Sequence, residues 1–154
     1  MMKEAVKLVL REKTLFDVIF LDGTVKRYDI LSLADEYPEL NQLKDRTIFE
    51  KGRLLGWSGV SWTDDIDITV QTVYLDGKDV TSEYDYDEIC LAALGYRIKD
   101  ARLGQYMSQE ELAKKTGIDQ SDLSKIEKGL ANPSIKTICR IAKGLGLKIE
   151  VLFK

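Results

Sequence analysis

The second half of the chain is divided into short segments by residues that begin and end helices. Ser108-Gln109-Glu110-Glu111 is a capping box, in which the serine hydroxyl accepts from a free helix amide and the last glutamate reaches back to the serine. Gly117 and Gly129 stand where a left-handed residue ends a helix. Asp119 and Ser134 are residue types that cap the start of a helix. These signals limit the helices after residue 108 to about two or three turns each.

Residues 88–145 are therefore expected to form four or five short helices. Apolar residues recur at close to helical period in Glu88–Leu103, and the caps define the segments that follow, Gln109–Thr116, Gln120–Lys128 and Ile135–Leu145. Gln109–Thr116 and Gln120–Lys128, joined by a turn at Gly117, make a helix-turn-helix. Its shared core is expected to contain small or apolar side chains, namely Leu112, Ala113, Ile118, Leu123 and Ile126.

The expected helix Gln120–Lys128 has a polar face without acidic residues. At ~100° per residue, this face spans about 140° of the helix, and it contains Gln120, Ser121, Ser124, Lys125 and Lys128. In the major groove glutamine pairs with adenine, lysine donates to guanine, and serine bonds to either. The face therefore predicts a recognition helix for double-stranded DNA. Asp119 and Asp122 add negative charge beside it, which leaves open a degenerate module that no longer binds DNA.

The order of motifs in this half resembles a known family. SQEELA, a glycine, LSKIEKG and NPS follow one another between Ser108 and Ser134, after a basic segment with Arg97, Lys99 and Arg102. Over residues 88–146 the chain is similar to the phage repressor/Cro or xenobiotic-response-element (XRE-type) helix-turn-helix family, which includes HigA-like antitoxins and transcriptional regulators.

The resemblance implies roles for individual residues. Gln109, at the start of the second helix, corresponds to a residue that clamps a DNA phosphate, and Lys128 and Asn132 correspond to positions that touch the backbone. Arg102 and Glu127 match an ion pair that links the first helix to the recognition helix, although Arg102 could also reach a phosphate. The positions that correspond to base contacts are Gln120, Ser121, Ser124 and Lys125.

Charge is divided unevenly along the chain. Residues 1–86 contain 11 Lys/Arg and 17 Asp/Glu, a net charge of −6, whereas residues 87–154 contain 12 and 9, a net charge of +3. The acidic, turn-prone segment 81–87 separates the halves, so we expect an acidic domain at 1–82 and a DNA-binding domain at 87–154. A charge of only +3 implies modest affinity per subunit, and therefore a homodimer on a two-fold DNA site.

The first half is expected to be strand-rich. Apolar patterning predicts strands at 5–11, 15–21 and 24–30, and Asp22-Gly23 is a tight-turn pair. The remaining expected elements are short helices at 31–37 and 41–50, a strand or hairpin at 53–62, and a strand or short helix at 70–75.

Three motifs of this half carry a second resemblance. Phe20-Leu21-Asp22-Gly23, Leu43-Lys44-Asp45 and Gly59-Val60-Ser61-Trp62 are similar to motifs of a small bacterial family of unknown function, over residues 4–78. That family is a compact α+β unit often encoded beside small candidate toxins. The resemblance, with the acidity of this half, implies a basic toxin as partner; the alternative is a solvated acidic surface. The chain would then be the antitoxin of a toxin–antitoxin pair that represses its own operon.

Two tryptophans leave a different function open. Trp57 and Trp62 could line a pocket in which the N-terminal domain of a stand-alone regulator senses a small ligand. Aromatic residues at strand spacing are also typical of a hydrophobic core, and we expect that role for them.

The composition argues against an enzyme. The chain has no histidine, which removes Ser-His-Asp triads, Cys-His nucleophiles and histidine-ligated metals. Cys90 and Cys139 cannot complete a zinc site and are expected as core residues in a reducing compartment. Asp64, Asp65 and Asp67 lack the pattern of a calcium loop, so we expect structural roles for them: Asp67 could cap a short helix, and Asp64 and Asp65 could form a turn. We expect no catalytic site, cofactor, metal or membrane segment, and a cytoplasmic location.

The end of the chain has a different pattern. Leu147–Lys154 alternates apolar and charged residues, which predicts a strand that pairs with a two-fold mate or with the N-terminal sheet. The expected fold class is therefore α+β: a small strand-rich α+β domain, then an all-α lambda-repressor-like helix-turn-helix domain with a C-terminal strand.

Overall fold

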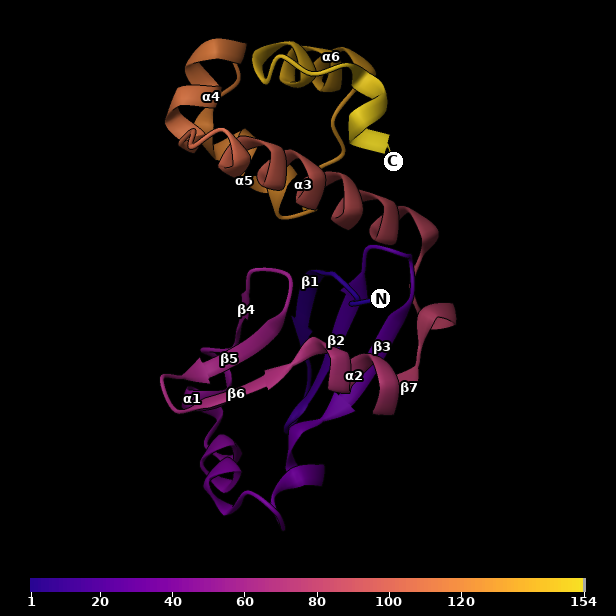
Figure 1. Cartoon of the computed structure of the whole chain (residues 1–154), viewed down its shortest axis with the longest axis vertical. Helices are drawn as coiled ribbons and strands as arrows, with labels where there is room; N and C mark the ends of the chain where they lie inside the picture. The colour runs from indigo at the N-terminus through magenta and orange to yellow at the C-terminus, as the bar shows by residue number, and fades with distance from the viewer. Residues whose placement is uncertain (154) are drawn as a thin grey trace. The chain divides into compact units, whose positions relative to one another are not determined.

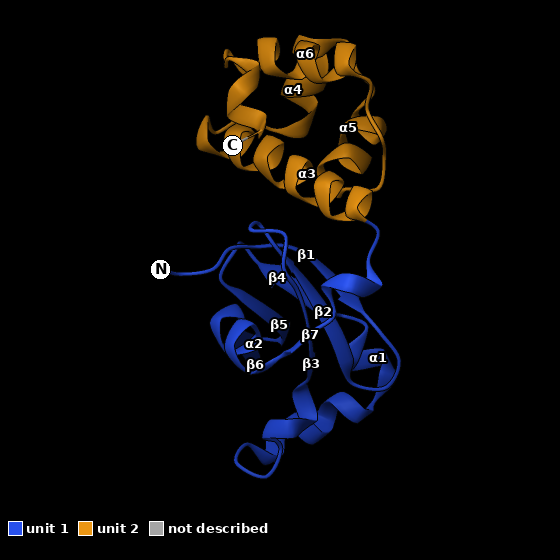
Figure 2. Ribbon diagram, turned by 90° about the vertical axis from the view of Figure 1, so that its right-hand side faces the viewer, with its two compact units in different colours: residues 1–85 blue, residues 86–154 orange. Residues whose placement is uncertain are grey.

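The computed structural model describes residues 1–153, and the chain divides into two compact units, unit 1 (residues 1–85) and unit 2 (residues 86–154) (Figure 2). Unit 1 contains two antiparallel sheets and short helices, whereas the described part of unit 2 contains helices only (Figure 1). The predicted mixed α+β fold is confirmed. Among residues 1–153, none of the helices is both long enough and apolar enough to cross a membrane.

The first sheet of unit 1 has the order β1-β2-β3-β7. Its strands are β1 (Ala5–Leu10), β2 (Leu15–Phe20), β3 (Val25–Asp29) and β7 (Lys78–Asp79). Gly23, with φ 89°, allows the tight turn between β2 and β3. The first three strands agree with the predicted segments to within two residues at each end, because apolar alternation and the turn pair are local signals.

The second sheet is a three-stranded meander followed by a helix. It contains β4 (Arg53–Leu55), β5 (Gly59–Thr63) and β6 (Ile66–Thr69), and α2 (Val70–Asp76) starts directly after β6. Asp67 does not cap this helix, which was one of the structural roles that the sequence left open for it. Asp67 is an exposed residue within β6, and Thr69 is the N-cap, with its hydroxyl accepting from the Thr72 amide.

The segment between β3 and β4 contains shorter helices than predicted. It consists of the 3-10 helices η1 (Ile30–Leu33) and η2 (Pro38–Lys44) and the single α-turn α1 (Arg46–Phe49). The predicted continuous helix at 41–50 is broken at Asp45, because the Asp45 carboxylate accepts the Thr47 amide at 2.9 Å and begins a new helix there. A further 3-10 turn, η3 (Thr81–Glu83), follows β7.

The two tryptophans lie in different environments. Trp62 is 4% exposed and packs in the core, where its ring stacks on Phe49 at 5.9 Å and meets the edge of Phe16 at 5.4 Å. Trp57 is 37% exposed, between β4 and β5. The core role predicted for both residues holds for Trp62 and is wrong for Trp57.

Two carboxylates, one on the first sheet and one at its β2–β3 turn, are hydrogen-bonded to neighbouring donors. Asp17 is fully buried on β2 and accepts from Arg27 Nε at 2.8 Å and from the Tyr84 hydroxyl at 2.6 Å. Asp22, beside the β2–β3 turn, accepts from Lys3 Nζ at 3.0 Å and from the Tyr74 hydroxyl at 2.9 Å. Burial raises the pKa of Asp22, but the Thr24 amide and these two donors outweigh it and lower the pKa to about 2.

Residues 86–153, the described part of unit 2, form four α-helices and a short final turn. They are α3 (Tyr86–Gly104), α4 (Gln109–Thr116), α5 (Gln120–Glu127), α6 (Ile135–Gly144) and the 3-10 helix η4 (Ile149–Phe153).

The predicted helix starts and stops of unit 2 are mostly confirmed. Ser108 accepts the Glu111 amide at 3.1 Å, and Ser134 accepts the Thr137 amide at 3.2 Å. Gly117 (φ 69°) and Gly129 (φ 70°) adopt the left-handed conformation at the ends of α4 and α5. Asp119 occupies the N-cap position of α5, but its side chain makes no capping hydrogen bond.

Two predictions for unit 2 are wrong. The C-terminal strand expected at 147–154 is η4 over its described part, because Leu152 turns into the helical core with 1% exposure; Lys154 lies outside the described residues. Alternation over so short a segment does not distinguish a strand from a 3-10 turn with one apolar side. Cys90 and Cys139 are exposed rather than buried.

Candidate nucleic-acid interface

Helix α5 presents two chemically different sides. Leu123 and Ile126 are 0% and 5% exposed and join the core of unit 2 with Leu112. The opposite side carries Gln120, Ser121, Lys125 and Lys128, all exposed, and the half-buried Ser124. We call these five residues the polar face of α5. The structure thus places all the predicted base contacts on one side of one helix.

The side chains of the polar face have no partner in the described part of unit 2. Among residues 1–153, no hydrogen bond or ion pair joins the side chains of Gln120, Ser121, Ser124, Lys125 or Lys128 to the rest of the chain. Asp122 is exposed and, in the same described part, forms no ion pair with Lys125. Donors and acceptors that are exposed and unengaged are available to a ligand.

A close contact between helices holds α5 from its buried side. A Cβ added at Gly95, in the middle of α3, would lie 2.5 Å from the Ile126 carbonyl oxygen, and one at Gly129 would lie 2.9 Å from Ala92 Cα. Only glycine permits this approach of the α3 and α5 backbones. The sequence did not single out Gly95, because a glycine within a helix has no local signature of a close contact.

A buried ion pair joins the same two helices. Arg102, on α3, donates from Nε to Glu127 Oε1 at 2.6 Å and from Nη2 to Glu127 Oε2 at 3.1 Å. Its Nη1 donates to the Met107 carbonyl at 2.8 Å. The two side chains are 7% and 2% exposed. This bidentate geometry fixes the C-terminal end of α5 against α3.

Gln109 belongs to the same network. Its Nε2 donates to Glu127 Oε2 at 2.7 Å, so one carboxylate accepts from both Arg102 and Gln109. An amide nitrogen has two hydrogens, and the second remains available to an outside acceptor. Gln109 is half-buried at the start of α4. The sequence predicts separate roles for Gln109 and Glu127 and has no local signal for the bond between them, because they lie 18 residues apart.

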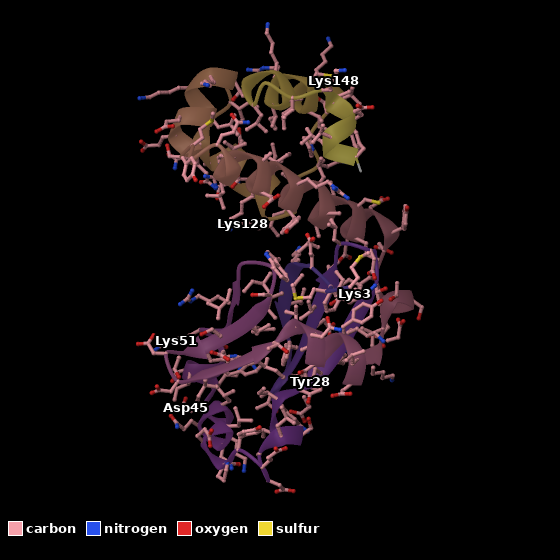
Figure 3. All side chains as sticks on the ribbon, in the orientation of Figure 1. Lys3, Tyr28, Asp45, Lys51, Lys128 and Lys148 are labelled. Carbon is pink, nitrogen blue, oxygen red and sulfur yellow. The ribbon has the colours of Figure 1, made fainter. Side chains whose placement is uncertain are left out.

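The remaining predicted contacts lie in two environments. Asn132 is exposed in the loop between α5 and α6. Arg102 is inside unit 2 with its guanidinium engaged, which favours the structural role of the Arg102–Glu127 pair over a contact to phosphate. Figure 3 shows Lys128 beside α3 and α5, whereas Lys148 lies on a different side of the unit, beside α6.

Comparison with known proteins assigns similarity to the helical half. The helix-turn-helix family HTH_3 matches residues 98–152. An uncharacterized HTH-type transcriptional regulator of Archaeoglobus fulgidus is 44% identical over 57 residues, which are 37% of this chain and 80% of the relative. The immunity repressor protein of Bacillus phage phi105 is 34% identical over 59 residues, 38% of this chain and 41% of that protein.

A solved structure is also similar to this part of the chain. It is the restriction-modification controller protein C.Esp1396I, solved as a tetramer in complex with its natural 35 base-pair operator. The two chains are 38% identical, with a TM-score of 0.40, and the match covers 42% of this chain and 84% of the other.

Proposed function

Because the chain belongs, through residues 98–152, to the HTH_3 helix-turn-helix family of transcriptional regulators, we propose that it is a sequence-specific repressor that binds operator DNA with the polar face of α5. The observation that supports this most strongly is the contrast between the two sides of α5. Its inner side is fixed by the Gly95 contact and the Arg102–Glu127 pair, and its polar face is unengaged among the described residues. A rigid helix with free polar side chains is what reading a base sequence requires.

The proposed contacts divide into two kinds. Gln120, Ser121, Ser124 and Lys125 contact base edges in the major groove. Gln109, Lys128 and Asn132 contact phosphates, the first through the amide hydrogen that Glu127 leaves free. Arg102 acts through Glu127 as a positioning residue rather than by touching DNA. The charge of +3 over residues 87–154 supports a homodimer on a two-fold site, because few phosphates are neutralised per subunit.

Gel-shift titrations of the full chain on selected and scrambled duplexes test this assignment. Selection of bound fragments from genomic DNA supplies the specific sequence. Lys125→Ala is expected to lower the ratio of specific to nonspecific affinity by about tenfold, because it removes one base contact. Gln109→Ala is expected to weaken binding to both duplexes alike.

The matched control is Lys148→Ala, which removes the same charge from an exposed site away from the polar face (Figure 3). It is expected to leave the specificity ratio unchanged. Equal losses on both duplexes for Lys125→Ala would show that this residue contacts phosphate and not bases. A loss of specificity in Lys148→Ala would contradict the placement of the interface on α5.

We further propose that the chain is an antitoxin whose unit 1 binds a small basic toxin encoded beside it. The net charge of −6 over residues 1–86 supports a basic protein partner, since opposite charge accelerates association. The burial of Trp62 weighs against the alternative of a ligand pocket formed by both tryptophans.

Co-expression of the neighbouring gene product tests this second proposal. The full chain is expected to relieve growth arrest caused by that protein and to purify with it. Growth arrest that persists with an equal amount of the folded chain would refute the antitoxin role and leave the DNA-binding proposal intact.

A further inference from the structure

Unit 1 has a small groove on the side formed by η1, η2, β6 and the start of α2. Its volume is about 250 Å³. The floor is apolar and consists of Ile30, Leu33, Leu40, Ile66 and Ile68. The rim carries Glu39, Asp65 and Asp67, which are exposed, together with Tyr37. A groove with an apolar floor and a negatively charged rim suits a ligand with an apolar stem and a positively charged end.

The carboxylates around this groove have no basic partner in the part of the chain that the structure describes. The two segments that form it, residues 30–40 and 63–72, contain six carboxylates and no lysine or arginine; the carboxylates are Asp35, Glu36, Glu39, Asp64, Asp65 and Asp67. Among residues 1–153, none of the six forms an ion pair. In the first sheet, by contrast, Asp17 and Asp22 are paired with Arg27 and Lys3. The groove therefore has charge complementary to a cation.

Tyr37 supplies an aromatic surface on the rim. Tyr37 is 46% exposed, although it lines the groove. The neighbouring Glu36 carboxylate raises the pKa of Tyr37, which is a sign of the negative potential at this edge. An exposed aromatic face beside carboxylates is favourable for a guanidinium, which stacks on the ring while it donates to oxygen.

We propose that this groove binds the arginine side chain of a basic protein segment. The volume of about 250 Å³ is below the roughly 300–1,000 Å³ of typical small-molecule sites, which favours one side chain over a free metabolite. The aliphatic stem lies on the apolar floor, and the guanidinium donates to Asp65 and Asp67 and stacks on Tyr37. This inference deepens the proposed protein-binding role of unit 1 and is independent of DNA binding.

The test is an NMR titration of the full chain with a short capped glycine–serine peptide that carries one central arginine. We expect saturable shifts of the backbone amides of Ile66–Thr69 and Thr72. The peptide with citrulline in place of arginine has the same shape without the charge and is expected not to saturate. Asp65→Asn combined with Asp67→Asn is expected to weaken binding about threefold to tenfold, because exposed charge pairs are individually weak.

Asp76→Asn is the single-charge control, because Asp76 is an exposed carboxylate of the same unit outside the groove. It is expected to leave the affinity within about twofold, the range of a long-range charge effect. Glu39→Gln, on the η2 side of the groove, provides a second variant if the double variant does not fold. Equal weakening by Asp76→Asn, or equal binding of the citrulline peptide, would overturn the proposal.

Two further measurements separate this inference from the alternatives. Free arginine that binds more tightly than the peptide would assign the groove to a small metabolite and overturn the protein partner. Gel shifts of the same variants report on DNA binding separately. A chain that binds DNA but not the peptide refutes the groove alone, and one that binds the peptide but not DNA refutes the function proposed for α5.

Discussion

Glu127→Gln is expected to destabilise unit 2 severely. The change keeps the shape of the side chain but removes the negative charge that pairs with Arg102, whose side chain is 7% exposed. Leaving one member of a buried pair uncompensated costs about 3–5 kcal/mol, and the remaining amide oxygen recovers part of that by accepting one hydrogen bond. We therefore expect a loss of about 3 kcal/mol. At ~0.05–0.15 kcal/mol per residue, a unit of this size has only about 3–10 kcal/mol of stability.

Urea unfolding of the full chain measures this loss with an internal control. Both tryptophans, Trp57 and Trp62, lie in unit 1, so their fluorescence reports on that unit. The helical circular-dichroism signal comes mainly from unit 2, which contains α3, α4, α5 and α6. Glu127→Gln is expected to lower the midpoint of the helical transition and to leave the fluorescence transition unchanged.

The double variant Arg102→Met with Glu127→Leu separates charge from packing. Replacing both members of a buried ion pair by apolar residues is often neutral, because the desolvation cost of both charges disappears. We expect the double variant to recover stability to within about 1 kcal/mol of the native chain. A single-variant loss below about 1 kcal/mol, or a double variant no more stable than the single one, would refute the reasoning.

Two further predictions concern the packing of unit 2 and the acid stability of unit 1. Gly95→Ala is expected to lower the urea-unfolding free energy of unit 2 by about 1–3 kcal/mol, because its Cβ would lie 2.5 Å from the Ile126 carbonyl oxygen. Gly104→Ala is the control in the same helix: a Cβ there would have nothing within 4 Å, so it is expected to be neutral or stabilising. A larger loss of stability for Gly104→Ala than for Gly95→Ala would refute this prediction. The pKa of Asp22 is lowered to about 2, so its contribution to stability is present above the ordinary carboxyl pKa near 4 and is lost as pH falls towards 2. In thermal unfolding followed by tryptophan fluorescence, Asp22→Asn is expected to reduce the fall of the melting temperature between about pH 4 and pH 2. A fall as steep as that of the native chain would contradict the assignment.

The helices of unit 2 were predictable because their signals are local. A capping hydroxyl, a left-handed glycine and an apolar period each act within one or two turns, so Ser108, Ser134, Gly117 and Gly129 could be placed from sequence alone. The polar face of α5 followed from the same geometry. The bounds of α4 and α5 agree with the predicted segments to within one residue.

The errors arose where a local pattern has more than one tertiary outcome. The alternation before Leu152 fits a strand, but this segment forms a 3-10 helix that packs Leu152 into the apolar core of unit 2. Cys90 and Cys139 stand among apolar residues in sequence, and both are on the exposed side of their helices. Asp67 is a residue type that caps helices, but β6 continues to Thr69, and Thr69 is the N-cap of α2. Only the packed structure distinguishes these outcomes.

The bond between Gln109 and Glu127 links the stability of unit 2 to its proposed function. Arg102 and Gln109 donate to the same carboxylate, so the pair that fixes α5 against α3 also sets the direction of the amide at the start of α4. The double variant Arg102→Met with Glu127→Leu removes the acceptor that orients the Gln109 amide and keeps the packing between α3 and α5. It is expected to unfold like the native chain and yet to bind all DNA sequences more weakly, which a purely structural role for the pair does not predict.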